Sequence, residues 1–384
     1  MIVQSSFPIV KHLDPPIYED AFFVANDFVH YWLMQAIQKS ASDIHFEPYE
    51  NFYRMRFRLD GLLCEMATVP LSAAERLTAC LKVMAHLDTS ERRLPQDGRF
   101  QIENMQGECI DCRMSTCPTV NGEKIVVRLL QRSSLQLDIH QLGLNEQQKT
   151  IFLRALKQPQ GMILVTGPTG SGKTVTLYTA LTLLNQPEKN ICTVEEPVEI
   201  KLPGINQVGV NLKAGLTFSK VLRAFLRQDP DVIMLGEIRD LETAQIAINA
   251  AQTGHLVLST LHANGAVETL IRLLNLGIEP FQVADSVKLI IAQRLVRKIC
   301  MHCQGKFCEH CHLGYRGRAA LFEVLPLTPE FISKISKENF NLNALTQYAQ
   351  ENGMMSLYEA GLEKVALGLT TEVEVKRVVM GSLR

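Results

Sequence analysis

Short apolar runs alternate with longer amphipathic stretches through the second half of the chain. The runs are typical of buried strands, whereas the stretches repeat their apolar positions every three or four residues, as helices do. Strands separated by helices predict a mostly parallel sheet covered by helices, with ligands bound at the carboxyl ends of the strands. The predicted order is strand 162–166, helix 173–184, strand 191–195, helix 217–228, strand 232–236, helix 241–251 and strand 255–260.

A different pattern covers the first half of the chain. Residues 53–60 alternate apolar and basic side chains and stop at Asp60-Gly61, which predicts a strand that enters a tight turn. Helical spacing covers 24–39 and 71–86, and Asn121-Gly122 marks a hairpin turn between two further extended segments. This half is therefore expected to be a smaller α/β domain. The expected organisation is an extended lead-in over 1–24, this smaller domain over 25–132, a polar linker over 133–142 and a second domain over 143–384.

Composition limits the classes of function. The 384 residues are enough for two hydrophobic cores, and 46% of them are hydrophobic. A formal charge of −1, from 39 basic and 40 acidic residues, gives no overall attraction to nucleic acid or anionic lipid. We therefore expect protein partners and no direct nucleic-acid contact. No apolar run approaches the ~20 residues that span a bilayer, and the first residues lack the pattern of a secretory signal, so we expect a cytoplasmic protein.

A glycine-rich segment joins the strand expected at 162–166 to the helix expected at 173–184. Glycines allow consecutive backbone N–H groups to converge on phosphate oxygens, and the helix adds its positive amino-terminal end. In this pattern Lys173 reaches the β- and γ-phosphates and the Thr174 hydroxyl binds Mg²⁺. The sequence therefore predicts that the chain binds ATP or another nucleoside triphosphate. The predicted loop consists of Gly167, Pro168, Thr169, Gly170, Ser171, Gly172, Lys173 and Thr174.

Polar side chains follow three further apolar runs, at the sheet edge where the phosphates are expected. Phosphoryl transfer needs a carboxylate that holds the metal shell or orients the attacking water. Glu237, after the run 232–236, is our first candidate for this role and Glu199 is the second. Which of the two takes the proton stays open. His262 and His255 are candidates for a role near the γ-phosphate, although a buried structural histidine is a nearly equal alternative for each.

Ten cysteines in a cytoplasmic chain favour metal binding or free thiols over disulfides. Two Cys-x-x-Cys pairs, separated by four residues, can supply four thiolates to a structural, tetrahedral Zn²⁺. The nearby His302, His310 and His312 are weaker ligand candidates. Cys109 and Cys112 have the same spacing, but they lie on an expected strand, where residues three apart point to opposite faces, so we expect structural thiols there. The expected zinc ligands are Cys300, Cys303, Cys308 and Cys311.

These motifs together resemble those of type II secretion and type IV pilus assembly ATPases. The resemblance rests on the phosphate loop, the acidic box 195–199, the segment 227–240 and the histidine box 255–262. It continues upstream in 41–48 and 94–99 and downstream through the cysteines, so that it covers most of the chain.

The resemblance implies a hexameric motor. Its second domain would be a RecA-like P-loop ATPase domain and its first a PAS-like domain, with ATP bound between them and hydrolysed to ADP with Mg²⁺. Family members work with an inner-membrane platform protein, which implies peripheral association with the cytoplasmic face of that membrane through protein partners. Arginines of the first domain contact phosphates in such proteins, and the matching positions here are Arg99, Arg113 and Arg128.

This chain departs from the family pattern in two places. The acidic box usually reads Glu-Asp-Pro, and here Glu196 replaces the aspartate. Members often carry an additional amino-terminal docking domain, whereas none precedes residue 25 here, so we expect docking through another surface. Retraction motors generally lack the cysteines, which favours pilus extension or secretion for this chain. Gly353 resembles part of a family motif in which a glycine ends one helix before the next begins.

Two other classes of function stay open from the sequence. RecA-like domains and zinc ribbons also occur in nucleic-acid motors, although the near-neutral charge and the lack of an interleaved basic and aromatic strip argue against that class. A regulatory nucleotide-binding switch that hydrolyses ATP very slowly is the second alternative.

Overall fold

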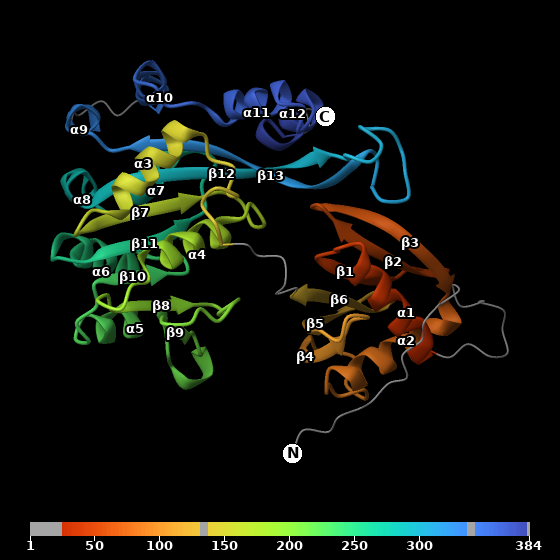
Figure 1. Cartoon of the computed structure of the whole chain (residues 1–384). Helices are drawn as coiled ribbons and strands as arrows, with labels where there is room; N and C mark the ends of the chain where they lie inside the picture. Colours follow the sequence, from red (N-terminus) through yellow and green to blue (C-terminus); the bar gives the residue numbers. More distant parts are fainter. Residues whose placement is uncertain (1–24, 131–136, 336–341, 382–384) are drawn as a thin grey trace. The chain divides into compact units, whose positions relative to one another are not determined.

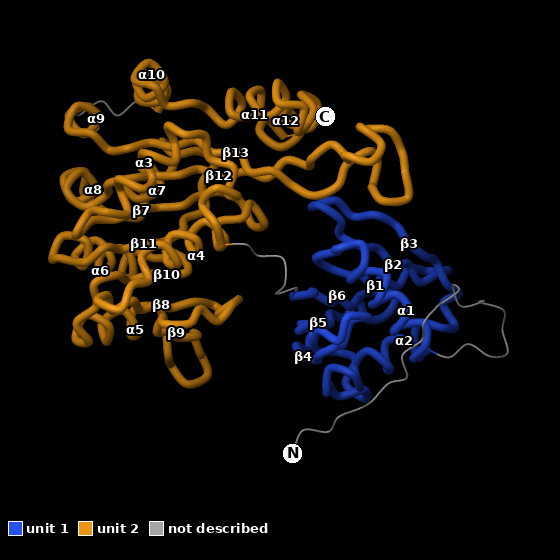
Figure 2. Tube along the Cα trace, viewed as in Figure 1, with its two compact units in different colours: residues 1–134 blue, residues 135–384 orange. Residues whose placement is uncertain are grey.

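Two compact units make up the chain in this computed structural model: unit 1 contains residues 1–134 and unit 2 contains residues 135–384 (Figure 2). The lead-in expected over 1–24 lies outside the described residues, as does part of the linker expected over 133–142. The structure describes residues 25–130, 137–335 and 342–381.

Unit 1 is an antiparallel sheet with two helices on one face (Figure 1). Alternation along the strands produces this arrangement, because Ile44 and Phe46 point into the core while Asp43 and His45 lie on the other face. The helices complete the core with residues such as Trp32. The elements are α1 (Ala25–Gln38), β1 (Asp43–Pro48), β2 (Phe52–Leu59), β3 (Leu62–Pro70), α2 (Leu71–Met84), β4 (Gln96–Glu103), β5 (Cys109–Thr119) and β6 (Gly122–Leu130).

The six strands of unit 1 follow the order β3-β2-β1-β6-β5-β4. The hairpin predicted at Asn121-Gly122 is confirmed, since it joins β5 to β6. The expected orientation of two thiols is also confirmed: Cys109 is exposed and Cys112 is buried, on opposite faces of β5.

Unit 2 is built on a seven-stranded sheet in which the first six strands along the chain run parallel and the last one antiparallel. The predicted parallel-rich sheet is therefore confirmed. The strands are β7 (Gly161–Thr166), β8 (Ile191–Glu195), β9 (Asn206–Gly209), β10 (Val232–Leu235), β11 (Leu256–Leu261), β12 (Val287–Ile299) and β13 (Tyr315–Pro326).

Helices cover both faces of this sheet, which follows the order β13-β12-β7-β11-β10-β8-β9 (Figure 1). The first two helices pack on one face, and most of the others pack on the opposite face around a second core. Among the helices of the described ranges, none combines the length and the apolar character needed to cross a bilayer. The helices are α3 (Glu146–Leu156), α4 (Lys173–Leu184), η1 (Leu212–Ala214), α5 (Phe218–Phe225), α6 (Leu241–Gln252), α7 (Ala266–Asn275), α8 (Pro280–Ser286), α9 (Pro329–Ile335), α10 (Leu342–Glu351), α11 (Leu357–Ala366) and α12 (Glu372–Val379).

The helix predicted over 217–228 is shorter than expected and ends at Phe225. The cause lies in the next residues, because Pro230 disfavours helical geometry at the residue before it, and Asp229 takes a φ of +49°. By contrast, the expected glycine between the two carboxy-terminal helices is confirmed: Gly353 has a φ of +92° and ends α10.

The long hairpin of β12 and β13 was not predicted. Apolar residues in β12 follow both alternate and three-or-four-residue spacing, so the sequence pattern fits a strand and a helix equally well. In the structure β12 pairs with β7 on one side and with β13 on the other, and the segment between the two strands contains the four cysteines.

Candidate nucleotide site

The predicted phosphate loop lies between β7 and α4, in the context that its chemistry requires. Every residue of β7 is buried, so the strand brings the loop to the sheet edge. Gly167 has a φ of +147°, and a Cβ at this position would lie 2.5 Å from the Gln293 carbonyl oxygen. The loop therefore packs directly on β12, and only glycine fits there. The amino-terminal end of α4 follows at once and favours an anion.

Two side chains of the loop fit a phosphate ligand. The Lys173 Nζ donates hydrogen bonds to the carbonyl oxygens of Gly167 and Pro168, at 2.8 and 3.0 Å. Burial lowers the pKa of Lys173, although the charge of Glu237 opposes this shift. Within the described residues, the Ser171 Oγ is buried without a hydrogen-bond partner. An anion at this loop would supply the acceptors for both groups.

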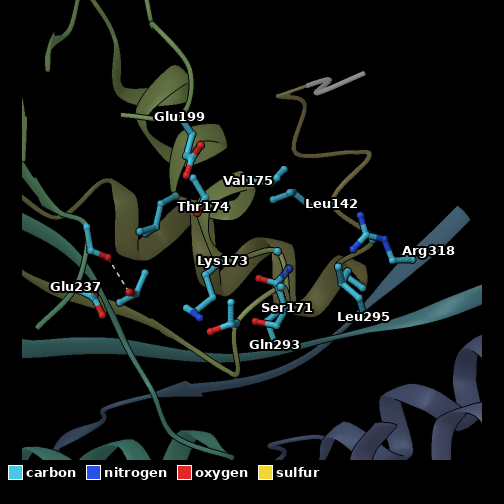
Figure 3. Close-up of a pocket in the computed structure, with 18 of the residues that line it drawn as sticks. Leu142, Ser171, Lys173, Thr174, Val175, Glu199, Glu237, Gln293, Leu295 and Arg318 are labelled. Atoms are coloured by element: carbon cyan, nitrogen blue, oxygen red, sulfur yellow. Dashed lines mark hydrogen bonds between the residues drawn. The ribbon is translucent and has the colours of Figure 1, made fainter. Parts of the chain in front are cut away.

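A pocket of about 750 Å³ opens from the phosphate loop. In the close-up view, Lys173 lies between Glu237 on one side and Leu142, Leu295 and Arg318 on the other (Figure 3). Side chains that follow three neighbouring strands, β8, β10 and β11, also line the pocket. The prediction that these strand ends meet at the phosphate loop is therefore confirmed.

Glu237 follows β10 and accepts hydrogen bonds from two neighbours. The Arg239 Nη2 lies 2.5 Å from one carboxylate oxygen, and the His262 Nε2 lies 3.2 Å from the other. Burial alone would raise the pKa of Glu237, but the hydrogen bond and charge of Arg239, together with His262, lower it. The carboxylate is therefore ionised at neutral pH, as a metal-binding or water-orienting group must be.

The acidic box separates into three environments. Glu195 turns inward, where it is 3% exposed and accepts hydrogen bonds from the Tyr178 hydroxyl and from the Thr193 Oγ1 at 2.6 Å. Glu196, the residue that departs from the family pattern, forms an ion pair with Arg239 at 3.1 Å. Glu199 lines the pocket on the side of Thr174 (Figure 3). Of the three carboxylates, Glu195 supports the sheet, and Glu199 is the one beside the phosphate loop.

The two candidate histidines lie at opposite ends of β11. His262 follows the strand and lines the pocket, where it contacts Glu237. His255 precedes the strand, and its Nδ1 lies 3.0 Å from the Ala250 carbonyl oxygen, away from the pocket lining. His255 therefore lies outside the lining of the pocket, and His262 is the candidate that lies within it.

The four predicted cysteines come together at the tip of the β12–β13 hairpin. Their sulfur atoms all lie within 4.8 Å of one another, and individual pairs are 3.5, 3.6 and 3.8 Å apart. A Zn–S bond of about 2.3 Å gives tetrahedron edges of about 3.8 Å. The cluster thus fits a tetrahedral zinc ion with four thiolate ligands. The ligand set is Cys300, Cys303, Cys308 and Cys311.

The three predicted arginines form a row across unit 1. Arg99, Arg113 and Arg128 lie directly opposite one another on β4, β5 and β6. Asp43 continues the row on β1 and accepts a hydrogen bond from the Arg128 Nε at 2.9 Å. These four residues line a hollow of about 460 Å³. Like charges on adjacent strands repel, so the arginine row is an electrostatically costly arrangement.

Sequence reasoning missed the residues that the β12–β13 hairpin contributes to the pocket. Gln293 is buried at the back of the phosphate loop and its Oε1 accepts a hydrogen bond from the Thr176 Oγ1 at 2.7 Å. Leu295 and Arg318 line the far end of the pocket. The ambiguous spacing of β12 concealed the first two, and Arg318 was missed because its strand, β13, was not predicted either.

These features define a P-loop nucleoside triphosphatase with a RecA-like domain. They are a strand, a glycine loop and a helix in succession, and an acidic residue after a neighbouring parallel strand. Comparison with known proteins narrows this class. Residues 19–377 match the Type II/IV secretion system protein family. The chain belongs to that family and is an ATP-hydrolysing enzyme.

Two relatives illustrate the similarity. The type IV pilus assembly ATPase PilB of Pseudomonas aeruginosa is 52% identical over 397 residues, which cover 95% of this chain and 70% of that protein. The type II secretion system protein E of the same organism is 43% identical over 372 residues, which cover 90% of this chain and 74% of that protein.

Solved structures share the fold. The ATPase DotB of Legionella pneumophila matches with a TM-score of 0.75 at 21% identity, over 96% of this chain and 99% of that one. The pilus retraction motor PilT with bound ADP matches with a TM-score of 0.63 at 25% identity, over 93% of this chain and 97% of that one.

Proposed function

We propose that this protein is a hexameric, cytoplasmic ATPase motor that powers type IV pilus assembly or type II protein secretion. The observation that carries the proposal is one pocket in unit 2 that brings the phosphate loop together with Glu199 and the Glu237–His262 pair. The relatives named for pilus assembly and type II secretion support the two alternatives for the machine.

Each group in the pocket has a proposed role. Lys173 binds the β- and γ-phosphates, and the Thr174 hydroxyl holds Mg²⁺, which neutralises phosphate charge when bound. The ionised Glu237 orients the attacking water or the metal shell, with His262 fixing its carboxylate, and Glu199 assists from the side of Thr174. The arginine row of unit 1 adds positive charge toward phosphates, a role that its costly side-by-side arrangement supports.

We further propose extension or secretion rather than retraction, with a structural zinc ion in the cysteine cluster. The support is the cluster itself and the higher identity to an assembly ATPase than to the retraction motor. Partners are expected to be an inner-membrane platform protein and further copies of this chain. Metal analysis of protein purified without chelators should find about one zinc per chain, and none after Cys308→Ser; a metal-free wild-type protein would reject the site.

The test of the motor proposal is steady-state Mg-ATP hydrolysis at increasing protein concentration, with and without single-stranded DNA. A rate per chain that rises with concentration and ignores DNA is expected, because active sites completed between subunits need assembly. Sedimentation over the same concentrations should show a hexamer. A concentration-independent rate that DNA strongly stimulates would overturn the proposal in favour of a nucleic-acid motor.

A further inference from the structure

Arg294 is a buried arginine of β12 that lies beside the phosphate loop, outside the pocket lining. The residue is only 7% exposed. The Nη1 donates to the Gln293 carbonyl oxygen at 3.0 Å, and the Nη2 donates to the Asn264 carbonyl oxygen at 2.8 Å. In the described part of the chain it forms no ion pair with a carboxylate. Burial lowers the pKa of Arg294, and the charges of Glu323 and Glu268 oppose this shift without a direct contact. Because a guanidinium stays protonated in proteins, Arg294 is a buried positive charge that no carboxylate of the described residues touches.

A second arginine on the same strand shows how unusual this is. Arg297 is 8% exposed, and Glu374 accepts hydrogen bonds from its Nε and Nη2 at 3.1 and 2.9 Å. A buried charge normally has such a partner, since an unpaired charge loses its hydration without compensation. Both arginines are buried on β12, and among the described residues only Arg297 has a carboxylate within hydrogen-bond distance.

The position of the guanidinium brings its charge close to the phosphate loop. A Cβ built on Gly167 would be 3.2 Å from the Arg294 Nη1, so the guanidinium packs against the back of the phosphate loop. The charge of Arg294 also reaches the phosphate side of that loop: after burial and the opposing effect of Glu237, it is the third influence on the pKa of Lys173, which it lowers. A negative ligand on the loop would interact with both cations.

The same guanidinium holds the segment that carries His262. Arg294 binds the carbonyl oxygen of Asn264, two residues after His262. The Ala263 N–H donates to the Thr166 Oγ1 at 3.0 Å, immediately before the phosphate loop. The segment is thus held to β7 and to β12 at once, which sets the distance between His262 and the phosphate loop.

We propose that Arg294 is a positioning residue for ATP binding, whose buried charge attracts the nucleotide phosphates across Gly167. The phosphate loop itself supplies the direct phosphate contacts. Arg294 adds a long-range attraction that grows with the negative charge of the ligand. A residue that merely holds the fold together would affect all nucleotides equally.

The experiment compares ATP, ADP and AMP, each with Mg²⁺, by calorimetric titration of the full chain. For Arg294→Gln, the Kd for ATP should rise roughly tenfold, for ADP about threefold and for AMP little, as expected for one unit charge near the phosphates at an effective dielectric constant of about 20. Arg294→Lys retains the charge and should keep the ATP-to-AMP affinity ratio within about threefold of wild type.

Arg297→Gln is the matched control. It breaks the buried pair with Glu374 and should lower the melting temperature, while the ATP-to-AMP ratio stays at the wild-type value. An equal loss for all three nucleotides in Arg294→Gln, or a lysine variant whose ratio falls as far as that of glutamine, would overturn the proposal. If Arg294→Gln does not fold, the lysine variant decides alone: an unchanged ratio supports the proposal and a fallen ratio refutes it.

Discussion

The phosphate loop of unit 2 and the arginine row of unit 1 both gather positive groups, and they are built in opposite ways. The loop is one continuous segment whose geometry comes from glycines and from the start of α4. The row comes from three separate strands, and only the register of the sheet places Arg99, Arg113 and Arg128 side by side. The first site is therefore encoded by one local segment, whereas the second depends on sheet pairing and on Asp43, which binds Arg128.

The largest expected effect tests the loop. Lys173→Ala should reduce ATP hydrolysis at least 1,000-fold, because the only lysine in the loop that can reach the phosphates is lost. Phosphate release under saturating Mg-ATP measures this. Lys213→Ala, at an exposed position in η1, is the control and should leave the rate unchanged. Substantial hydrolysis in the first variant would remove the loop from the active site.

The next effect separates chemistry from binding in the same pocket. Glu237→Gln should lower kcat roughly 100-fold and leave ATP binding within about threefold, since the ionised carboxylate acts on water or metal rather than on the adenosine. Glu242→Gln changes an exposed carboxylate that pairs with Arg223 and serves as the control. Retained turnover in the Glu237 variant would transfer the role to Glu199.

The arginine row should respond differently from the loop. Arg99→Gln is expected to lower hydrolysis about tenfold while raising the free energy of unfolding by a few tenths of a kcal/mol, because it relieves repulsion with Arg113. Arg76→Gln, on the exposed side of α2, provides the comparison. Kinetics and urea unfolding on the same samples measure both quantities. If activity and stability fall together, Arg99 is structural.

The smallest effect concerns the acids of unit 1. Glu47 accepts two hydrogen bonds of 2.8 Å from Arg56, and although burial opposes it, these bonds and Lys124 lower the pKa of Glu47 to about 2. A lowered folded-state pKa stabilises the protein above about pH 5 and loses that contribution as the pH falls toward 2. Glu47→Gln should therefore cost about 1 kcal/mol at pH 7 and weaken the acid dependence of unfolding. An unaltered pH profile would contradict this account.

The same contrast explains what could be predicted from the sequence. The phosphate loop, the acids after β8 and β10 and the paired cysteines were predicted because short segments encode them. The arginines were named only through resemblance, since nothing in a single strand shows that three of them will be neighbours. Gln293 and Arg294 escaped altogether, because the spacing of β12 fits two periods and both residues depend on how that strand packs against the loop.

β12 connects two places that are otherwise far apart in the domain. The strand begins at Val287, packs against the phosphate loop at Gln293 and ends at Ile299, one residue before the first cysteine, with a shift of register after Arg297. Extended chain gains about 3.3 Å per residue, so the seven residue steps from Gln293 to Cys300 span at most about 23 Å. The cysteine cluster and the back of the phosphate loop are therefore connected by a single short segment of β12 and not by separate elements.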